Sequence, residues 1–153
     1  MEKKRVYADT SVFGGAYDRG FDEASSRFFS QIADGRFQLV ISTLVLKELE
    51  PAPPNVQGVL DEVRELLELA EITPSVNALA EAYIRAGVVS TKWAEDAIHV
   101  AAATVSRCGM IVSWNFKHIV QYDKIPLYNA VNTLQGYGNI GIFSPLEVVY
   151  GKD

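Results

Sequence analysis

Three acidic residues lie in separate segments of the chain, next to short apolar runs that resemble strands or helices. They are Asp9, Glu48 and Asp96, and Asn115 follows another apolar run. Oxygen ligands suit Mg²⁺ and Mn²⁺, and Mg²⁺ usually takes one or two carboxylates while keeping several waters. Two unit charges about 4 Å apart repel by about 4 kcal/mol at an effective dielectric of about 20, so gathered carboxylates need a cation or protons. A divalent ion there can polarise a phosphoryl oxygen and make hydroxide from water, which indicates a phosphodiesterase site.

Each of these residues also has a purely structural interpretation. Asp9 can cap a turn through its side chain, and Asn115 can do the same for the turn that follows it. Glu48 can be a solvated acid on a short helix, and Asp96 can favour the positive end of a helix dipole. Glu95 lies about 100° around the same helix from Asp96, so we expect it to face solvent.

Hydroxyl, imidazole and ammonium groups lie close to these acids in the sequence. Ser11 follows Asp9 by two residues, and Lys117 and His118 follow Asn115. We expect Lys117 and His118, with Lys92 as a further candidate, to meet substrate phosphates, although His118 can also be a helix cap.

His99 lies three residues after Asp96, on a neighbouring face of the helix, and can orient that acid, meet a phosphate or simply be a packed core histidine. A zinc site built from His99, His118 and a carboxylate lacks the tight ligand spacing of such sites.

The elements that must position these residues alternate along the chain. Apolar runs without alternation, typical of a parallel sheet buried on both faces, predict the strands. The alternation predicts a three-layer α/β/α fold with a central, mainly parallel sheet and right-handed crossovers. Ligands bind beyond the carboxyl ends of such strands, which would bring the four oxygen-bearing side chains to one edge. The expected strands are 4–8, 37–42, 71–73, 110–114 and 146–150, and the expected helices are 21–33, 43–50, 56–69, 75–86 and 92–108.

Composition limits the class of protein. A chain of 153 residues with 48% hydrophobic and 22% charged residues is ordinary for a globular protein, and we expect one domain over residues 1–153. No apolar stretch approaches the roughly 20 residues that span a bilayer, and no signal peptide is evident. The single cysteine, Cys108, fits a reducing cytoplasm. With 14 basic and 19 acidic residues the net charge is −5, which argues against non-specific sliding on DNA.

Four segments, in order, resemble the PIN-domain family, of the kind found as VapC-like toxins of type II toxin–antitoxin pairs. They are residues 6–13 (VYADTSVF), 41–49 (ISTLVLKEL), 96–103 (DAIHVAAA) and 111–119 (IVSWNFKHI). Together they span about residues 5 to 125, and the WNFKHI segment is similar to a particular subgroup of these proteins.

The resemblance implies a metal-dependent endoribonuclease, here with Mg²⁺ or Mn²⁺, that is held inactive by a cognate antitoxin and, like many toxins of the family, forms a homodimer. The family's first three acids correspond to Asp9, Glu48 and Asp96, which would hold the metal, and Ser11 to a hydroxyl near the metal or the scissile phosphate. Family members often carry a further acid at the position of Asn115, so this chain has one negative charge fewer there.

Three alternatives remain at the level of sequence. The substitution at Asn115 suggests a catalytically weak or inactive PIN-like module that binds RNA or protein. A receiver-like phosphoacceptor domain needs a second acid beside Asp9, and a phosphatase of the haloacid dehalogenase type needs two aspartates two residues apart. Neither pattern is found at Asp9, so the nuclease interpretation is preferred.

Overall fold

The computed structural model describes residues 3–150, which fold around a five-stranded parallel sheet with the order β3-β2-β1-β4-β5. The central strand β1 pairs with both neighbours, so that Val6 lies opposite Leu39 of β2 and Met110 of β4. All strand pairs are parallel, which confirms the predicted fold class. The strands are β1 (Lys4–Ala8), β2 (Phe37–Ser42), β3 (Glu68–Ala70), β4 (Met110–Val112) and β5 (Gly141–Phe143).

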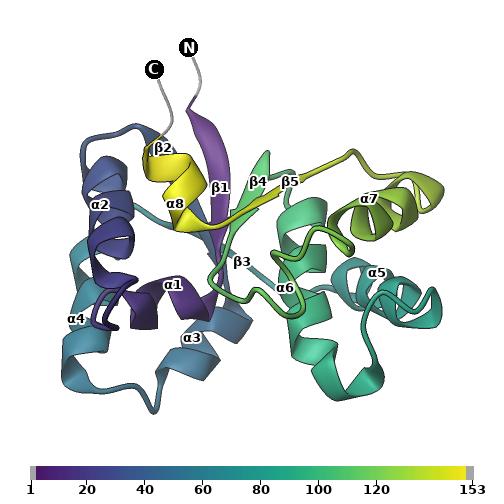
Figure 1. Ribbon diagram of the computed structural model, residues 1–153, viewed down its shortest axis with the longest axis horizontal. Coiled ribbons are helices and arrows are strands. Elements are labelled where there is room, and N and C mark those ends of the chain that lie inside the picture. Colours follow the sequence, from purple (N-terminus) through teal and green to yellow (C-terminus); the bar gives the residue numbers. More distant parts are fainter. Residues whose placement is uncertain (1–2, 151–153) are drawn as a thin grey trace.

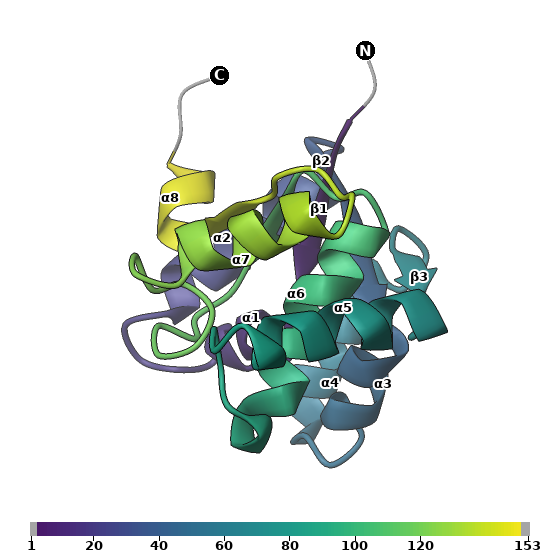
Figure 2. The same cartoon turned by 90° about the vertical axis from the view of Figure 1, so that its right-hand side faces the viewer.

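Helices cover both faces of the sheet and make the three predicted layers. Figure 1 shows the sheet almost edge-on, with α1, α2, α4 and α8 on one side and α5, α6 and α7 on the other. Figure 2 presents this second helical layer towards the viewer. The helices are α1 (Thr10–Gly15), α2 (Asp22–Ala33), α3 (Thr43–Leu49), α4 (Pro54–Val63), α5 (Pro74–Arg85), the 3₁₀ turn η1 (Thr91–Trp93), α6 (Ala94–Val105), α7 (Ile125–Leu134) and α8 (Pro145–Val149).

The core lies against the middle of the sheet. Val6, Tyr7 and Ala8 of β1 are fully buried, because helices cover both faces of this strand. The small side chains of α6, among them Ala101 and Ala102, are also fully buried and let this helix lie close to the strands. Close packing in the core therefore accounts both for the apolar residues of β1 and for the alanines of α6.

The predicted strand over 146–150 is wrong, since that segment belongs to helix α8. Ser144 has an extended backbone at the N-cap position, and Pro145 at the first helical position is preorganised for a helix. A short apolar run does not distinguish a strand from a buried helix, which explains the error. The fifth strand is β5 instead, which pairs with β4.

The predicted helix over 56–69 is too long, and the predicted strand over 71–73 begins too late. Helix α4 ends at Val63, and Glu68 pairs with Val40 of β2 as the start of strand β3. Leu66 and Leu69, which continue the helical apolar stripe in the sequence, are both nearly half exposed. The helical spacing of these leucines in the sequence therefore does not mean that they are buried.

The remaining boundaries differ by a few residues. Ser42 is the N-cap of α3, because its hydroxyl accepts a hydrogen bond from the backbone N–H of Val45. The strand expected over 110–114 ends at Val112, and the helix expected over 92–108 comprises η1 and α6. The ends of the predicted domain over 1–153, residues 1, 2 and 151–153, lie outside the described residues.

Two further helices, α1 and α7, lie where the sequence predicted no element. Gly14 and Gly15 lie inside α1, where Gly15 packs against the Trp114 side chain. Across residues 3–150, none of the helices has the length and apolar character needed to cross a membrane.

Candidate active site

The predicted acidic residues come from elements that meet at the carboxyl edge of the sheet. Asp9 follows the last residue of β1, and Glu48 lies on α3, which follows β2 directly. Asp96 lies in the first turn of α6, and Asn115 follows β4 by three residues. Because all strands run in the same direction, Asp9 and Asn115 leave the sheet at the same edge.

Asp9 is buried, with 4% of its surface exposed, and both of its carboxylate oxygens accept hydrogen bonds from serines. The hydroxyl of Ser11 donates to Oδ1 at 2.6 Å, and the hydroxyl of Ser113 donates to Oδ2 at 2.6 Å. Burial raises the pKa of Asp9, and the charge of Asp96 adds to this effect, whereas His99 and the two serines lower it. The net result is a raised pKa, as expected for a carboxylate in need of a positive partner.

Glu48 is paired with His99. Its Oε1 atom lies 2.7 Å from His99 Nε2 and accepts a hydrogen bond of 2.6 Å from the Thr10 hydroxyl. Burial opposes ionisation of Glu48, but the hydrogen bonds from His99 and Thr10 and the charge of His99 outweigh it and lower the pKa to about 2. Glu48 is therefore ionised at neutral pH.

Glu95 is exposed, as expected, but it is close enough to Glu48 to share a hydrogen bond with it. That hydrogen bond and the charge of Glu48 raise the pKa of Glu95. Glu95 is therefore a fourth acidic group beside the predicted three.

His99 is buried and electrostatically linked to all three predicted acids. Burial lowers the pKa of His99, but the hydrogen bond to Glu48 and the charges of Asp9, Glu48 and Asp96 outweigh burial and raise it. On its other side, His99 Nδ1 lies 2.8 Å from the hydroxyl of Tyr7. Of the roles considered for His99, the structure favours a packed, hydrogen-bonded histidine, and its neighbour is Glu48 instead of Asp96.

Asp96 is bound by His118 from a different part of the chain. Its Oδ2 atom lies 3.2 Å from His118 Nδ1, and the Asp96 side chain retains 20% exposure. The imidazole of His118 stacks on the indole of Trp93, with ring centroids 4.2 Å apart and an angle of 25° between the planes. His118 thus joins the segment after β4 to the start of α6.

Asn115 acts as a cap in this conformation. Its side-chain oxygen accepts hydrogen bonds from the backbone N–H groups of Lys117 at 3.2 Å and His118 at 3.0 Å. Its own backbone N–H donates to the hydroxyl of Ser113, which also holds Asp9. Asn115 therefore fixes the turn that presents Lys117 and His118.

The donor atoms suit Mg²⁺ or Mn²⁺ in type, but they are not arranged as a closed cage. Among residues 3–150, no group of three or more His, Cys, Asp or Glu side chains is placed to hold a metal ion. Instead, side-chain partners already contact oxygens of all three acids. They are Ser11 at Asp9, His99 and Thr10 at Glu48, and His118 at Asp96. Carboxylate oxygens fit a hydrated Mg²⁺ that takes one or two of them and keeps several waters, and they do not fit zinc held by histidine or cysteine.

The zinc alternative has no structural basis among the described residues. His99 and His118 contact different carboxylates, Glu48 and Asp96 respectively. Cys108 is buried, and burial raises the pKa of its thiol to about 12, so it is a thiol and not a thiolate ligand at neutral pH.

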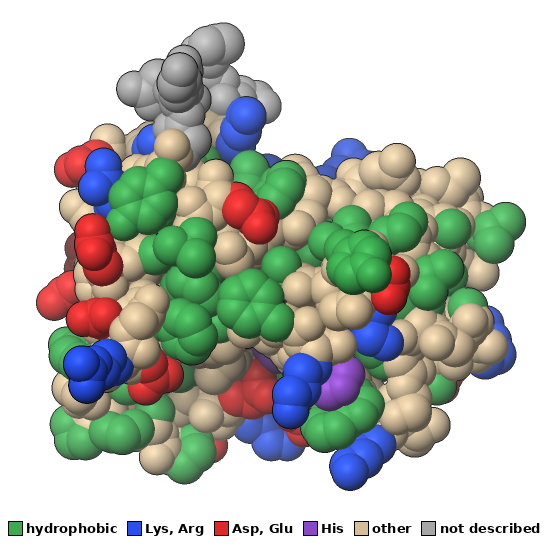
Figure 3. All heavy atoms as spheres, viewed as in Figure 1, with side chains coloured by type: hydrophobic (Ala, Val, Ile, Leu, Met, Phe, Trp, Pro, Cys, Tyr) green, Lys and Arg blue, Asp and Glu red, His purple; other side chains and the backbone are tan. Residues whose placement is uncertain are grey.

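A cavity of about 680 Å³ opens beside two of the acids, Glu95 and Asp96. In Figure 3, acidic side chains gather at a hollow in the lower part of the face, with basic, histidine and hydrophobic side chains along one side of it. Lys92 and Lys117 are exposed at this cavity, as a role in phosphate contact requires. The cavity is lined by Thr91, Lys92, Trp93, Ala94, Glu95, Asp96, Asn115, Lys117 and His118.

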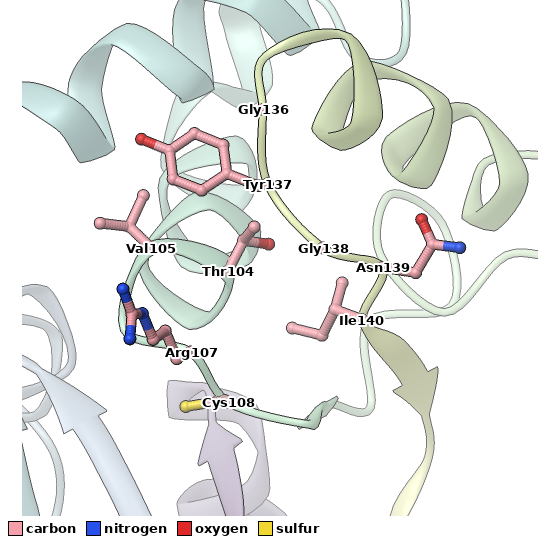
Figure 4. A pocket seen from close by; sticks show the side chains of 9 residues that line it. All are labelled: Thr104, Val105, Arg107, Cys108, Gly136, Tyr137, Gly138, Asn139 and Ile140. Atoms are coloured by element: carbon pink, nitrogen blue, oxygen red, sulfur yellow. The ribbon is translucent and has the colours of Figure 1, made fainter.

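A second cavity, of about 450 Å³, lies around the loop that enters β4 at its amino end (Figure 4). Its lining contains Arg107 and Cys108 but no carboxylate and no histidine. It therefore lacks the acid–base and metal-binding groups that gather at the other cavity.

Three residues of the site were missed by the sequence analysis as site residues. Ser113 and Thr10 each donate to a predicted acid, and Trp93 stacks on His118. Ser113 is the penultimate residue of the predicted strand over 110–114 and Thr10 follows Asp9, so their positions were available as signals. Trp93 had no such signal, because its contact with His118 joins residues 25 positions apart.

One comparison with solved structures bears on the fold. A chain in the crystal structure of VapBC2 from Rickettsia felis bound to a DNA fragment from their promoter is similar to this chain, with a TM-score of 0.55 and 16% sequence identity. The similarity covers 74% of this chain and 89% of that chain. It shows that this chain shares the fold of that chain, whereas membership of the PIN-domain family and of the WNFKHI subgroup stays a prediction. No protein-family model matches this chain, and no curated protein matches it.

Proposed function

We propose that this chain is a metal-dependent endoribonuclease that hydrolyses RNA phosphodiester bonds. The observation that carries the proposal is that three acids lie at the carboxyl edge of the sheet on separate elements: Asp9 directly after β1, Glu48 on α3 in contact with His99, and Asp96 in the first turn of α6. Asp96 also lines a cavity with two exposed lysines. A structural role for each acid alone does not explain why all three lie at this edge.

Asp9, Glu48 and Asp96 are the proposed holders of one Mg²⁺ or Mn²⁺, with Asn115 assisting. The bound ion would polarise a phosphoryl oxygen and supply hydroxide near neutral pH. Ser11 and Ser113 keep the Asp9 carboxylate in one orientation, since they bind its two oxygens. For Glu48 to act as a ligand, the carboxylate that now accepts from His99 and Thr10 must also turn an oxygen towards the ion.

Lys117, His118 and Lys92 are the proposed phosphate contacts. All three line the cavity beside Asp96, so the positive charge of the two lysines is local even though the net charge of the chain is −5. The lysine ammonium is a compact point charge on a flexible side chain, so it can follow the phosphates of an RNA strand that passes through the site.

A ribonuclease assay with added Mn²⁺ tests this proposal. We expect wild-type protein to cleave single-stranded RNA and Asp9→Asn to lose at least most of that activity. Asp34→Asn is a matched control, because Asp34 is an exposed aspartate that follows α2 and precedes the amino end of β2. Equal cleavage by wild type and Asp9→Asn would defeat the assignment.

We also propose that the protein is the cytoplasmic toxin of a type II pair, that its cognate antitoxin binds it, and that it forms a homodimer. Support comes from the fold shared with a chain of VapBC2, which was crystallised with promoter DNA. Expression of the chain alone should arrest growth, and co-expression of a small protein encoded beside it should relieve the arrest. Light scattering of the purified protein tests the dimer.

A second candidate is a PIN-like module with little or no catalysis that binds RNA or a protein. Asn115 favours it, because this residue caps a turn and carries no charge. Calorimetry with Mn²⁺ separates the two functions: tight RNA or antitoxin binding without metal binding would support the module. Asn115→Asp should raise Mn²⁺ affinity if position 115 belongs to the metal site, and an unchanged affinity would place it outside.

A further inference from the structure

We propose that Trp93 forms a binding subsite for one unpaired RNA base, directly beside the candidate active site. The inference depends on the proposed function for its ligand, RNA, and adds the residue that receives the base. It begins from three features of Trp93: its exposure, its stacking partner and the cavity that it lines.

Trp93 is a large aromatic residue that the fold leaves open. Its exposed fraction is 39%, whereas Trp114, the other tryptophan, is 7% exposed and is packed against Phe21. Trp93 belongs to the short turn η1, which has no buried residue. The core therefore gives no reason for an indole at this position.

One face of the indole is already held in place. The imidazole of His118 stacks on it at 4.2 Å, and His118 Nδ1 lies 3.2 Å from Asp96 Oδ2. The ring is therefore preorganised, so a base that stacks on Trp93 loses little entropy in ordering the protein side. Trp93 and Asp96 line the same cavity, so a base that stacks on Trp93 lies in the cavity that Asp96 also lines.

The other groups at the cavity suit a nucleotide strand. Lys92 Nζ lies 5.1 Å from the centre of the Trp93 ring, and Lys92 and Lys117 are both exposed. The flexible stem of Lys92 lets its ammonium leave the indole and meet a phosphate when a base arrives. An aromatic ring flanked by positive groups is how grooves for single-stranded nucleic acid bind bases and backbone together.

The size of the cavity also limits which RNA can enter it, because it has room for a single strand only. Its volume of about 680 Å³ lies within the range of about 300–1,000 Å³ usual for small-ligand pockets, so it admits a nucleotide and not a helix. A paired base is stacked on both sides and is not free to stack on a side chain, so recognition of this kind takes unpaired bases. Stacking tolerates every base, and the subsite therefore favours single strands over a particular sequence.

Binding of two matched oligonucleotides tests the subsite. The first is a fluorescein-labelled octamer of 2′-O-methyl adenosine, and the second is the same backbone with abasic residues. Binding is measured by fluorescence anisotropy in EDTA, so that neither cleavage nor a metal enters the result. Wild type should bind the adenosine octamer more tightly than the abasic one.

Trp93→Ala should weaken binding of the adenosine octamer roughly ten-fold and leave binding of the abasic octamer unchanged. Trp93→Phe should keep most of the affinity, because it retains a ring. Phe116→Ala is the matched control, since Phe116 is 46% exposed but does not line the cavity; it should bind both probes like wild type. Lys117→Met should weaken both probes alike, because it removes a phosphate contact.

Two results overturn the subsite: no binding of the adenosine octamer by wild type, or a Trp93→Ala variant that binds it as well as wild type does. An equal loss for both probes also overturns it, since the ring would then act on the backbone or on the fold. RNA cleavage with Mn²⁺ is measured separately. Base-dependent binding at Trp93 without RNA cleavage would contradict the nuclease proposal and support the subsite. RNA cleavage together with unchanged binding in Trp93→Ala would support the nuclease proposal and contradict the subsite.

Discussion

His99 Nε2 lies 2.7 Å from Glu48 Oε1, and this pair connects the core to the acidic edge of the sheet. On the core side, His99 Nδ1 contacts the Tyr7 hydroxyl, which in turn lies 2.8 Å from the hydroxyl of Ser42. Glu48 carries the chain of contacts outward to Thr10. The orientation of Glu48 is therefore set directly by side chains from α1 and α6 and, through His99, by side chains from β1 and β2.

This pair predicts how stability depends on pH. The raised pKa of His99 means that its stabilising contribution is fully present below about pH 6.5 and is lost as the pH rises through the higher pKa of the folded state. The lowered pKa of Glu48 affects stability in acid. The stabilising contribution of Glu48 is present above about pH 4.5 and is lost as the pH falls through about 2.

Glu48→Gln removes the acceptor charge that raises the pKa of His99. Urea unfolding between pH 6 and 9 should therefore show a smaller loss of stability with rising pH in Glu48→Gln than in wild type. The charge of Glu48 is not among the causes that shift the pKa of Asp9, but it raises the pKa of Glu95, so both proteins are compared in a Glu95→Gln background to isolate the pair. Parallel curves for the two proteins would contradict the ion pair.

Ser113→Ala should damage the candidate site without touching an acid. It leaves Oδ2 of the buried Asp9 without its 2.6 Å hydrogen bond, which should cost about 1–3 kcal/mol of stability. The hydrogen bond lowers the pKa of Asp9, so the variant should raise it further and shift the acidic limb of the pH–activity profile to higher pH. Ser75→Ala, at an exposed serine, is the control. An unchanged profile in a stably folded Ser113→Ala would show that Asp9 does not depend on this bond.

Two adjacent glycines of α1 should respond in opposite ways to alanine. A Cβ at Gly15 would lie 2.5 Å from Trp114 Nε1 and 2.8 Å from Ser25 Oγ, so Gly15→Ala should destabilise by roughly 1–3 kcal/mol through overpacking. A Cβ at Gly14 meets nothing within 4 Å, so Gly14→Ala should stabilise the helix by about 0.5–1 kcal/mol. Thermal unfolding measures both, and equal shifts for the two variants would contradict the close packing at Gly15.

The sequence predicted the fold and the segments that reach the site because both follow from local rules. Apolar runs gave β1, β2 and β4, and parallel strands must present the residues that follow them at one edge. Asp9 is the best example, since it follows β1 immediately and its position depends on no long-range packing.

The contacts between these segments could not be predicted in the same way. The pairing of Glu48 with His99 and the stacking of His118 on Trp93 depend on how α3, α6 and the segment after β4 pack together. The apolar pattern also could not identify α8 as a helix, because a segment of five residues with three buried positions fits a strand and a helix equally well.

Crystals grown with Mn²⁺ test the central claim most directly, because anomalous scattering locates the ion without assuming its ligands. The account predicts one anomalous peak at the carboxyl edge of the sheet, with oxygens of Asp9 and Asp96 bound to it directly or through waters, and loss of that peak in Asp96→Asn. A wild-type protein that cleaves RNA in Mn²⁺ but shows no peak near these two residues would contradict it.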